Sequence, residues 1–212
     1  MIKLSNRLQM VANLVREGKP LADIGTDHAY LPVYLVQKGI IPYAIATDIN
    51  EGPLENAKKT IKQAGLENKI KTILSDGLEN IPPIENITIT GMGGILISEI
   101  LKAKPEIKRK GTHLVLQPQS HVEDVREFLY KNGFEILRED VTKEGKHFYI
   151  ALEVVYTEKE QKLTDEKIYL GELLNSKSKC KDAYIEYLFR RLSMKKDSED
   201  LVKRLQKKVL KI

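Results

Sequence analysis

The sequence predicts an α/β protein: a doubly wound, mainly parallel seven-stranded sheet with an antiparallel last strand, followed by a C-terminal helical hairpin. Three observations support this prediction. Apolar runs typical of buried strands alternate with stretches of helical spacing from residue 21 to residue 131. Two later strand-like runs are joined by a short turn that contains Gly145. Beyond residue 157 only helical spacing remains, so we predict two domains, 1–157 and 158–212.

The elements are expected in the following order. An amphipathic helix begins behind Ser5, a good N-cap, and ends near Gly18. Strands are expected at residues 21–25, 43–48, 70–75, 87–90 and 113–117, with closing strands at 134–141 and 147–155. Helices are expected at about 30–38, 52–64, 94–102 and 121–131, with a weak one at 78–80. The C-terminal hairpin is expected at roughly 178–195 and 199–211.

The composition excludes several classes of protein. With 42% hydrophobic and 31% charged residues, the chain has the balance of a globular protein with a substantial core. The single cysteine, Cys180, favours a reducing compartment and argues against a disulfide scaffold, and no pattern suggests a metal site. No stretch resembles a signal peptide or a membrane span, which needs about 20 apolar residues. We therefore expect a cytoplasmic protein without a metal or a membrane partner.

The net charge of +5 is concentrated at one end of the chain. Residues 158–212 contain 15 Lys and Arg against 10 Asp and Glu, and this difference equals the whole excess. A neutral body with a basic tail favours contact with a polyanion through the tail, and nucleic acid is the usual candidate. The alternative is an ordinary solvated helical face.

The most informative segment runs from Leu21 to Pro32, where a buried strand enters a turn with one glycine, Gly25, between Asp23 and Asp27. A phosphate-binding turn keeps side chains away from its ligand, whereas carboxylates here would repel a pyrophosphate. They would suit a ligand with cationic groups and ribose hydroxyls, such as S-adenosylmethionine. The alternative is an Asx turn whose second aspartate caps the next helix.

Two more acidic residues end neighbouring strands. Asp48 lies 25 positions after Asp23, where it can accept hydrogen bonds from a ribose, although it could equally cap the following helix. Asp76 precedes Gly77 at the end of the third strand, where a carboxylate can accept an amino proton while glycine permits a tight turn. Because ligands bind outside the carboxyl ends of parallel strands, these carboxylates should converge on one crevice.

The fourth and fifth strands complete the predicted rim. Gly91, Met92 and Gly93 suggest close backbone approach to the reacting end of the cofactor and the incoming base, although Met92 could instead fill the core. Gln117, followed by Pro118, could read a base edge or simply end a strand. Tyr30 could stack on a base, but we expect it to pack in the core.

Several strings together resemble one family of enzymes. They are Ser5-x-Arg7-Leu8, the segment from Ala22 to Pro32, Asp76-Gly77-Leu78, Gly91-Met92-Gly93-Gly94 and Leu116-Gln117-Pro118. With the C-terminal helices, they resemble the bacterial tRNA (adenine(22)-N(1))-methyltransferases, a family within the class I S-adenosylmethionine-dependent methyltransferases. The resemblance covers essentially the whole chain. It implies a Rossmann-like fold, methyl transfer to N1 of an adenine in the D-arm region of tRNA, and a coiled-coil segment that helps to engage the RNA.

The resemblance and the motifs together define the candidate site. We expect cofactor contacts from residues on four strand ends: Asp23, Gly25, Thr26, Asp27, Asp48, Ile49, Asp76, Gly77, Gly91 and Met92. Candidate substrate contacts are Arg7, Gly93, Gln117, Pro118, Arg190 and Arg191. Asp27 and His28 are the candidate catalytic residues: Asp27 could stabilise positive charge on the base, while His28 could take a proton or be purely structural. We expect a monomer whose macromolecular partner is tRNA.

The fourth-strand loop bears on the reaction. Enzymes that methylate an exocyclic adenine amine commonly carry an Asn/Asp-Pro-Pro-aromatic motif there, whereas this chain has Thr90-Gly91-Met92-Gly93, without a carboxamide acceptor. Adenine N1 has an in-plane lone pair and needs no prior deprotonation, so it fits this loop better. Two alternatives stay open: a methyltransferase for another RNA or a small molecule, and a non-catalytic nucleotide-binding module whose helices recruit a partner.

Overall fold

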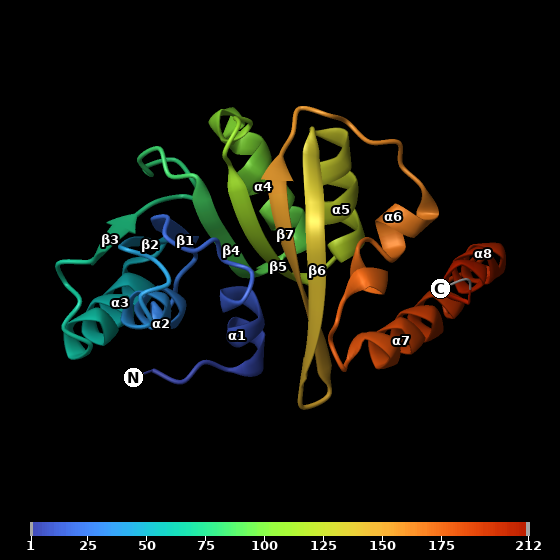
Figure 1. The fold of residues 1–212 in the computed structure, drawn as a ribbon, viewed down its shortest axis with the longest axis horizontal. Coiled ribbons are helices and arrows are strands. Elements are labelled where there is room, and N and C mark those ends of the chain that lie inside the picture. Colours follow the sequence, from blue (N-terminus) through green and yellow to red (C-terminus); the bar gives the residue numbers. More distant parts are fainter. Residues whose placement is uncertain (1, 211–212) are drawn as a thin grey trace.

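The computed structural model describes residues 2–210, which form one seven-stranded sheet and its covering helices (Figure 1). The strands are β1 (Leu21–Ile24), β2 (Ala44–Asp48), β3 (Ile70–Leu74), β4 (Asn86–Gly93), β5 (His113–Ser120), β6 (Phe134–Glu144) and β7 (His147–Tyr156). The helices are α1 (Asn6–Ala12), α2 (Tyr30–Gln37), α3 (Glu51–Gln63), α4 (Gly94–Ala103), α5 (Val122–Lys131), α6 (Asp165–Tyr169), α7 (Lys181–Ser193) and α8 (Glu199–Val209). Short 3-10 helices cover Pro105–Ile107 and Leu173–Asn175.

The sheet has the order β3-β2-β1-β4-β5-β7-β6, which confirms the predicted doubly wound architecture. Its first five strands are parallel, and β1 lies at the centre between β2 and β4. The antiparallel strand is β7, which lies between β5 and β6. All the parallel strands therefore end on the same side of the sheet; for β4 and β5 this is the lower side in Figure 1, where the β6–β7 turn also lies.

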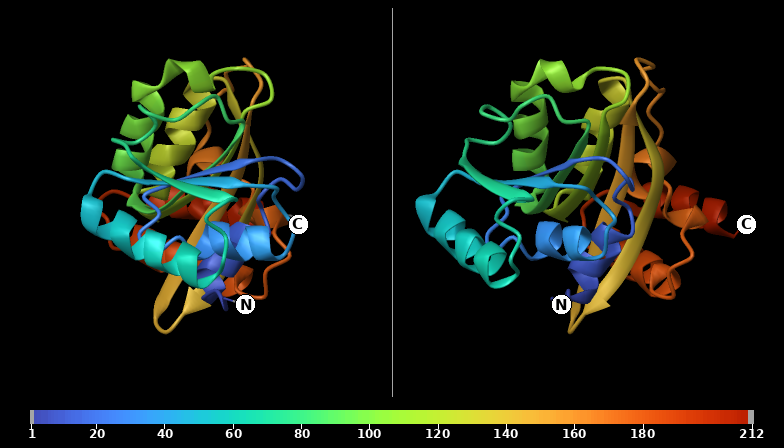
Figure 2. Two further views of the ribbon diagram at one scale, coloured as in Figure 1. Left: turned by 90° about the vertical axis from the view of Figure 1, so that its left-hand side faces the viewer. Right: turned by 60° about the vertical axis from the view of Figure 1, so that its left-hand side comes forward.

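Helices cover both faces of the sheet (Figure 2). One apolar cluster joins the sheet to α4 and α5, while a second joins it to α1, α2 and α3. This division explains why the strands in the middle of the sheet are apolar along their whole length: β1, for example, is buried at all four positions.

Three elements differ from the sequence-based expectations. The first helix ends at Ala12 instead of Gly18, because the chain turns there to carry Leu14 and Val15 into the core. The weak helix at 78–80 is absent; those residues form turns. β4 extends through the glycine-rich segment, whose backbone pairs irregularly with the end of β5. Backbone pairing thus replaces the loop that the glycines predicted.

The C-terminal segment packs on the α5 side of the sheet. Its buried residues Leu170, Leu173 and Leu188 belong to the same apolar cluster as the sheet residues. α7 and α8 contact each other, and α8 also contacts α6 through Arg204, which donates to Asp165 at 2.7 Å. The two predicted helices are present as α7 and α8, although residue 211, the predicted end of the second, lies outside the described residues. The C-terminal segment shares the core of the sheet.

A buried ion pair fixes the start of this segment. Arg126 of α5 and Glu139 of β6 have no exposed side-chain surface, and their charged groups are joined by two hydrogen bonds of 2.6 and 2.8 Å. Arg126 also donates to the carbonyls of Ile168 (3.0 Å) and Tyr169 (2.9 Å). Gly171 closes over the pair: a Cβ there would lie 2.4 Å from Glu139 Oε1. The ordering of α6 thus depends on a pair that the α5–β6 connection supplies.

Candidate active site

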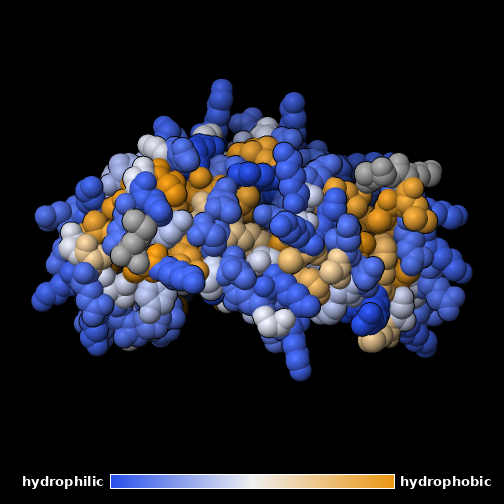
Figure 3. Space-filling model, turned by 60° about the horizontal axis from the view of Figure 1, so that its bottom comes forward, coloured by the Kyte–Doolittle hydropathy of each residue, from blue (hydrophilic) through white to orange (hydrophobic). Residues whose placement is uncertain are grey.

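A cavity of about 540 Å³ opens at the carboxyl ends of β1, β4 and β5, beside the N-terminal segment. This volume lies in the range typical of small-molecule sites. The cavity is lined by Lys3, Leu4, Ser5, Arg7, Leu8, Asp23, Gly25, Thr26, Asp27, His28, Tyr30, Leu31, Thr90, Gly91 and Gln119. Figure 3 turns this end of the molecule toward the viewer and shows hydrophobic surface scattered between hydrophilic side chains. Among the lining residues outside the predicted contacts, Thr90 belongs to the fourth-strand motif and Gln119 follows Gln117-Pro118, whereas no motif marks Lys3 and Leu4.

The loop after β1 has an unusual backbone. Gly25, Asp27 and Ala29 have φ values of +70°, +51° and +55°. Such values are common for glycine but cost energy for alanine, and they cluster at functional sites. Ala29, not Asp27, is the N-cap of α2, and no side chain caps the start of this helix. The alternative of a helix-capping aspartate is therefore wrong, and the Asp27 side chain stays free of that role.

Asp23 is the buried acid of the site. Its side chain accepts hydrogen bonds from Thr88 Oγ1 (2.6 Å) and Thr26 Oγ1 (2.7 Å), and only 3% of the Asp23 surface is exposed. Burial raises the pKa of Asp23 to about 6, although both hydroxyl groups act to lower it. No cation of the described residues lies within ion-pair distance of this carboxylate. A cationic ligand group would therefore be favoured beside it.

Asp27 and His28 lie at the open side of the cavity. The Asp27 side chain is 68% exposed, and its Oδ1 lies 3.6 Å from His28 Nε2. The His28 ring stacks on Tyr30, with 5.1 Å between centroids and 9° between planes. Tyr30 is 42% exposed, so our expectation that it packs in the core is wrong. The left-handed Ala29 between the two rings brings them to the same side of the loop.

The end of β4 forms a rim without side-chain bulk. Gly91 has φ +80° and faces Arg7, while a Cβ on Gly94 would lie 2.3 Å from the carbonyl oxygen of His121. Met92 reaches back to β1: a Cβ on Gly25 would lie 2.2 Å from Met92 Cε. Gly93 pairs with Ser120. The predicted Gly25 and Met92 therefore lie in direct contact, with Gly91 in the cavity lining.

Gln117 is fully buried and both ends of its carboxamide are occupied. Its Oε1 accepts from Arg7 Nη1 at 2.8 Å, and its Nε2 donates to the carbonyl of Pro118 at 2.9 Å. This arrangement suits neither direct reading of a base edge nor a simple strand end. Instead, Gln117 orients Arg7, which does line the cavity.

The other predicted cofactor contacts lie farther along the same edge. Asp48 accepts from the backbone N–H of Asn50 at 2.9 Å, and Ile49 is 58% exposed beside it. Asp76 and Gly77 line a separate hollow of about 270 Å³ against α4. These residues lie at or just after the ends of β2, the neighbour of β1, and of β3, one strand farther out, and they are outside the lining of the main cavity.

The two predicted arginines of α7 lie in different surroundings. Arg190 is exposed, whereas Arg191 is held at 3.1 Å from Glu123 of α5. The ion pair fastens α7 to the body, which favours a structural role for Arg191 and leaves Arg190 as the free cation of the two.

Within residues 2–210, no helix is long and apolar enough to cross a membrane, and no group of three His, Cys, Asp or Glu side chains is arranged to hold a metal ion. The site instead combines a central β1 loop with acidic side chains and a glycine rim on β4. A doubly wound sheet with this site defines the class of Rossmann-like methyltransferases. In agreement, residues 4–152 match the family described as "Methyltransferase domain".

Comparison with individual relatives identifies the family within this class of methyltransferases. The tRNA (adenine(22)-N(1))-methyltransferase of Bacillus subtilis is 42% identical over 153 residues, which span 71% of this chain and 64% of that protein. A Streptococcus pneumoniae protein solved in complex with S-adenosyl-L-methionine is 35% identical, with a TM-score of 0.85 over 98% of this chain and 100% of that chain. Mycoplasma capricolum TrmK, solved with S-adenosyl-homocysteine, is 32% identical, with a TM-score of 0.78 over 98% and 95%. The chain belongs to the tRNA (adenine(22)-N(1))-methyltransferase family.

Proposed function

We propose that this protein transfers the methyl group of S-adenosylmethionine to N1 of adenine 22 in tRNA. The observation that carries the proposal is the cavity at the ends of β1 and β4, where Asp23 and Asp27 stand in the loop that a phosphate-binding fold would fill with glycines. This lining fits a cofactor with an ammonium group, a sulfonium group and no phosphate. The solved relatives with S-adenosyl-L-methionine and S-adenosyl-homocysteine support the same cofactor.

The residues present suit methylation of a ring nitrogen. S-adenosylmethionine would supply an electrophilic methyl group, whose carbon leaves sulfur as it bonds to N1 of the base. Adenine N1 attacks with its in-plane lone pair, so no side chain has to remove a proton first, and the base gains the positive charge. The protein's task is to hold N1 at a near-attack distance of about 3 to 3.5 Å. Asp27 lies at the cavity mouth, where its carboxylate can stabilise the cationic base.

A base of folded tRNA must leave its stack to enter the cavity. The stacked pair of His28 and Tyr30 offers a planar surface at the opening, which suits an extruded purine. The exposed cations of the C-terminal segment, Arg190 among them, suit the phosphates of the same RNA. A tRNA substrate also accords with a cytoplasmic enzyme. We propose that it acts as a monomer.

The decisive experiment incubates the protein with labelled S-adenosylmethionine and unmodified tRNA, followed by nucleoside analysis. We expect 1-methyladenosine at position 22, and no label in a tRNA that carries guanine there. Label on N6, or on no nucleoside, would overturn the proposal. Label in the guanine control would favour the alternative of a different RNA site.

A further inference from the structure

Arg7 is held from three sides at the wall of the cavity. Its Nη1 donates to Gln117 Oε1 at 2.8 Å, and its backbone N–H donates to Glu144 at the tip of the β6–β7 hairpin. The ring of Tyr149 lies beneath the guanidinium, with 5.9 Å from Cζ to the ring centroid. Gln117 and Tyr149 thus hold the Arg7 side chain, while Glu144 holds its backbone, and such preorganisation lowers the entropic cost of binding a ligand.

The charge of Arg7 has no carboxylate partner. Arg126, Arg138, Arg191 and Arg204 each form an ion pair, whereas no carboxylate of residues 2–210 lies within 4.0 Å of the Arg7 guanidinium. Glu144 is adjacent, but its carboxylate accepts the backbone N–H of Arg7. The side-chain acceptor that does reach the guanidinium, Gln117, is neutral. A partly buried cation held by a neutral acceptor keeps its attraction for an anion.

Arg7 also lies next to the rim where the reaction is proposed. A Cβ on Gly91 would lie 3.5 Å from Arg7 Nη1 and 3.9 Å from Gln119 Nε2. The absence of that side chain leaves space beside the guanidinium, and Asp23 and Gly25 line the same cavity. Both a cofactor and a base bound there would come near this cation.

We propose that Arg7 is a preorganised receptor for an oxyanion, with Gln117 and Glu144 as its positioning residues. This inference rests on the proposed function. Two oxyanions are candidates for this receptor: the phosphodiester next to the target adenosine, and the carboxylate at the methionine end of the cofactor. Both offer the paired oxygens that a guanidinium binds best.

Two measurements on the full-length protein separate the two sources. The first is the Kd of S-adenosylhomocysteine by calorimetry; the second is methylation of tRNA that carries a single methylphosphonate next to adenosine 22. If the anion is the phosphodiester, Arg7→Gln should raise the KM for tRNA roughly tenfold or more, abolish sensitivity to the methylphosphonate and leave the cofactor Kd unchanged. If it is the carboxylate, the Kd should rise by a similar factor while the methylphosphonate penalty stays as in the wild type.

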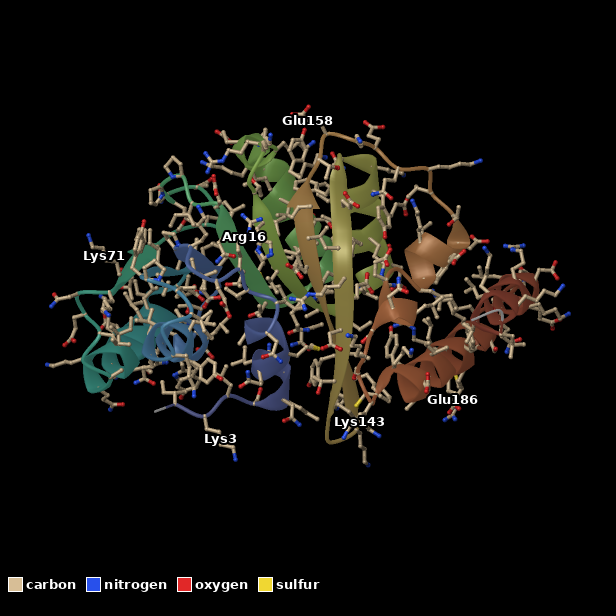
Figure 4. The ribbon with its side chains drawn as sticks, viewed as in Figure 1. Lys3, Arg16, Lys71, Lys143, Glu158 and Glu186 are labelled. Carbon is tan, nitrogen blue, oxygen red and sulfur yellow. The ribbon has the colours of Figure 1, made fainter. Side chains whose placement is uncertain are left out.

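Arg16→Gln is the matched control. Arg16 lies on the same N-terminal segment, but it donates to the carbonyl of Gly111 at the opposite end of the strands. Figure 4 shows Arg16 well above Lys3 and Lys143, which lie at the lower end of the molecule. This variant loses the same charge and should change neither measurement. The inference is overturned if Arg7→Gln, like Arg16→Gln, alters neither the cofactor Kd nor the response to the methylphosphonate.

Gln117→Glu tests the charge while keeping Arg7 in place. The new carboxylate would lie at hydrogen-bond distance from the guanidinium and neutralise it, while losing the hydrogen bond that the Gln117 amide donates to the Pro118 carbonyl. The same oxyanion should therefore bind as weakly as in Arg7→Gln. A purely structural role for Arg7 predicts the opposite, since an ion pair holds the side chain at least as firmly. Melting temperatures of both variants verify the fold. The calorimetric arm needs no RNA activity, so failure of the proposed function stays distinguishable from failure of this inference.

Discussion

Asp23 is a carboxyl group whose environment links cofactor binding to pH. Its pKa is raised to about 6 by burial, so its proton is held more readily in the folded protein than in the unfolded chain. Its contribution to stability is therefore fully present below the unfolded value of 3.8 and is lost as the pH rises through about 6, with a size on the order of 3 kcal/mol. A cationic ligand would favour the ionised form.

We expect the affinity for S-adenosylmethionine to fall as the pH drops from 7.5 to 5.0, because protonated Asp23 no longer attracts the ammonium or sulfonium group. Calorimetric titration at a series of pH values measures the effect, which should be on the order of tenfold for one unit below the pKa. Asp23→Asn should bind weakly at every pH and flatten the profile. An unchanged pH slope in this variant would assign the dependence to another group.

Asp27 and His28 are neighbours with different expected effects on turnover. Asp27→Ala should lose activity on tRNA by roughly tenfold to a hundredfold, because the cationic product forms without its carboxylate. His28→Ala should lose less, since N1 needs no base and Tyr30 keeps a surface for stacking. Single-turnover rates at saturating cofactor measure both. Wild-type rates for Asp27→Ala would remove it from the mechanism.

The acidic residues of this site could be predicted from sequence, whereas their partners could not. Asp23 follows directly from the strand-and-turn pattern, but its donor Thr88 lies 65 positions away and meets it only through the parallel register of β1 and β4. Likewise, the sequence suggested that Gln117 reads a base edge or simply ends a strand, whereas pairing with β4 buries it and its carboxamide binds Arg7. Contacts across strands depend on register, which the motifs do not encode.

Among the elements, the start of the C-terminal segment depends on one glycine. Gly171→Ala should destabilise the protein by several kcal/mol, because its Cβ would meet Glu139 Oε1 at 2.4 Å and Arg126 Nε at 2.6 Å. Gly65→Ala is the control: its φ of +65° carries the same backbone cost of about 1–2 kcal/mol, but nothing lies within 4 Å of the new Cβ. Urea denaturation compares the two. Equal losses would show that the buried pair tolerates the methyl group.

Element positions followed the apolar pattern closely, and their ends did not. The strand bounds of β1, β2 and β3 differ from the predicted ones by about one residue, because the apolar run of each sequence segment ends where the strand reaches the protein surface. β4 and β5 run on through Gly93 and Ser120, because their last residues pair with each other despite being glycine-rich and Pro-containing. The early end of α1 could not be predicted from the apolar pattern either, because Leu14 and Val15 fit the helical spacing but are buried by a turn.

At the scale of the whole molecule, the basic C-terminal segment is expected to bind tRNA. Arg190, Lys195 and Lys196 are exposed on or just after α7. Replacing all three with Glu should weaken tRNA binding at least tenfold and lower the slope of log K against log salt by roughly 2, while the cofactor affinity stays unchanged. Filter binding at several salt concentrations provides both numbers.

A variant with Lys59, Lys62 and Lys69 changed to Glu is the control. Lys59 and Lys62 are exposed on α3, which lies on the opposite face of the sheet from α7, and Lys69 is exposed directly before β3. The control has the same net charge as the first variant. If both variants lose tRNA affinity equally, net charge alone explains the effect, and the C-terminal segment has no special role.

The shared core has a consequence for how the molecule unfolds. Leu170, Leu173 and Leu188 lie in one apolar cluster with residues of the sheet, and Arg126 holds the chain just before Leu170 through two backbone carbonyls. Removing the C-terminal helices would therefore expose the sheet to water. The chain should melt in a single cooperative transition, so that a cofactor bound at the far edge also protects the backbone amides of α7 from hydrogen exchange.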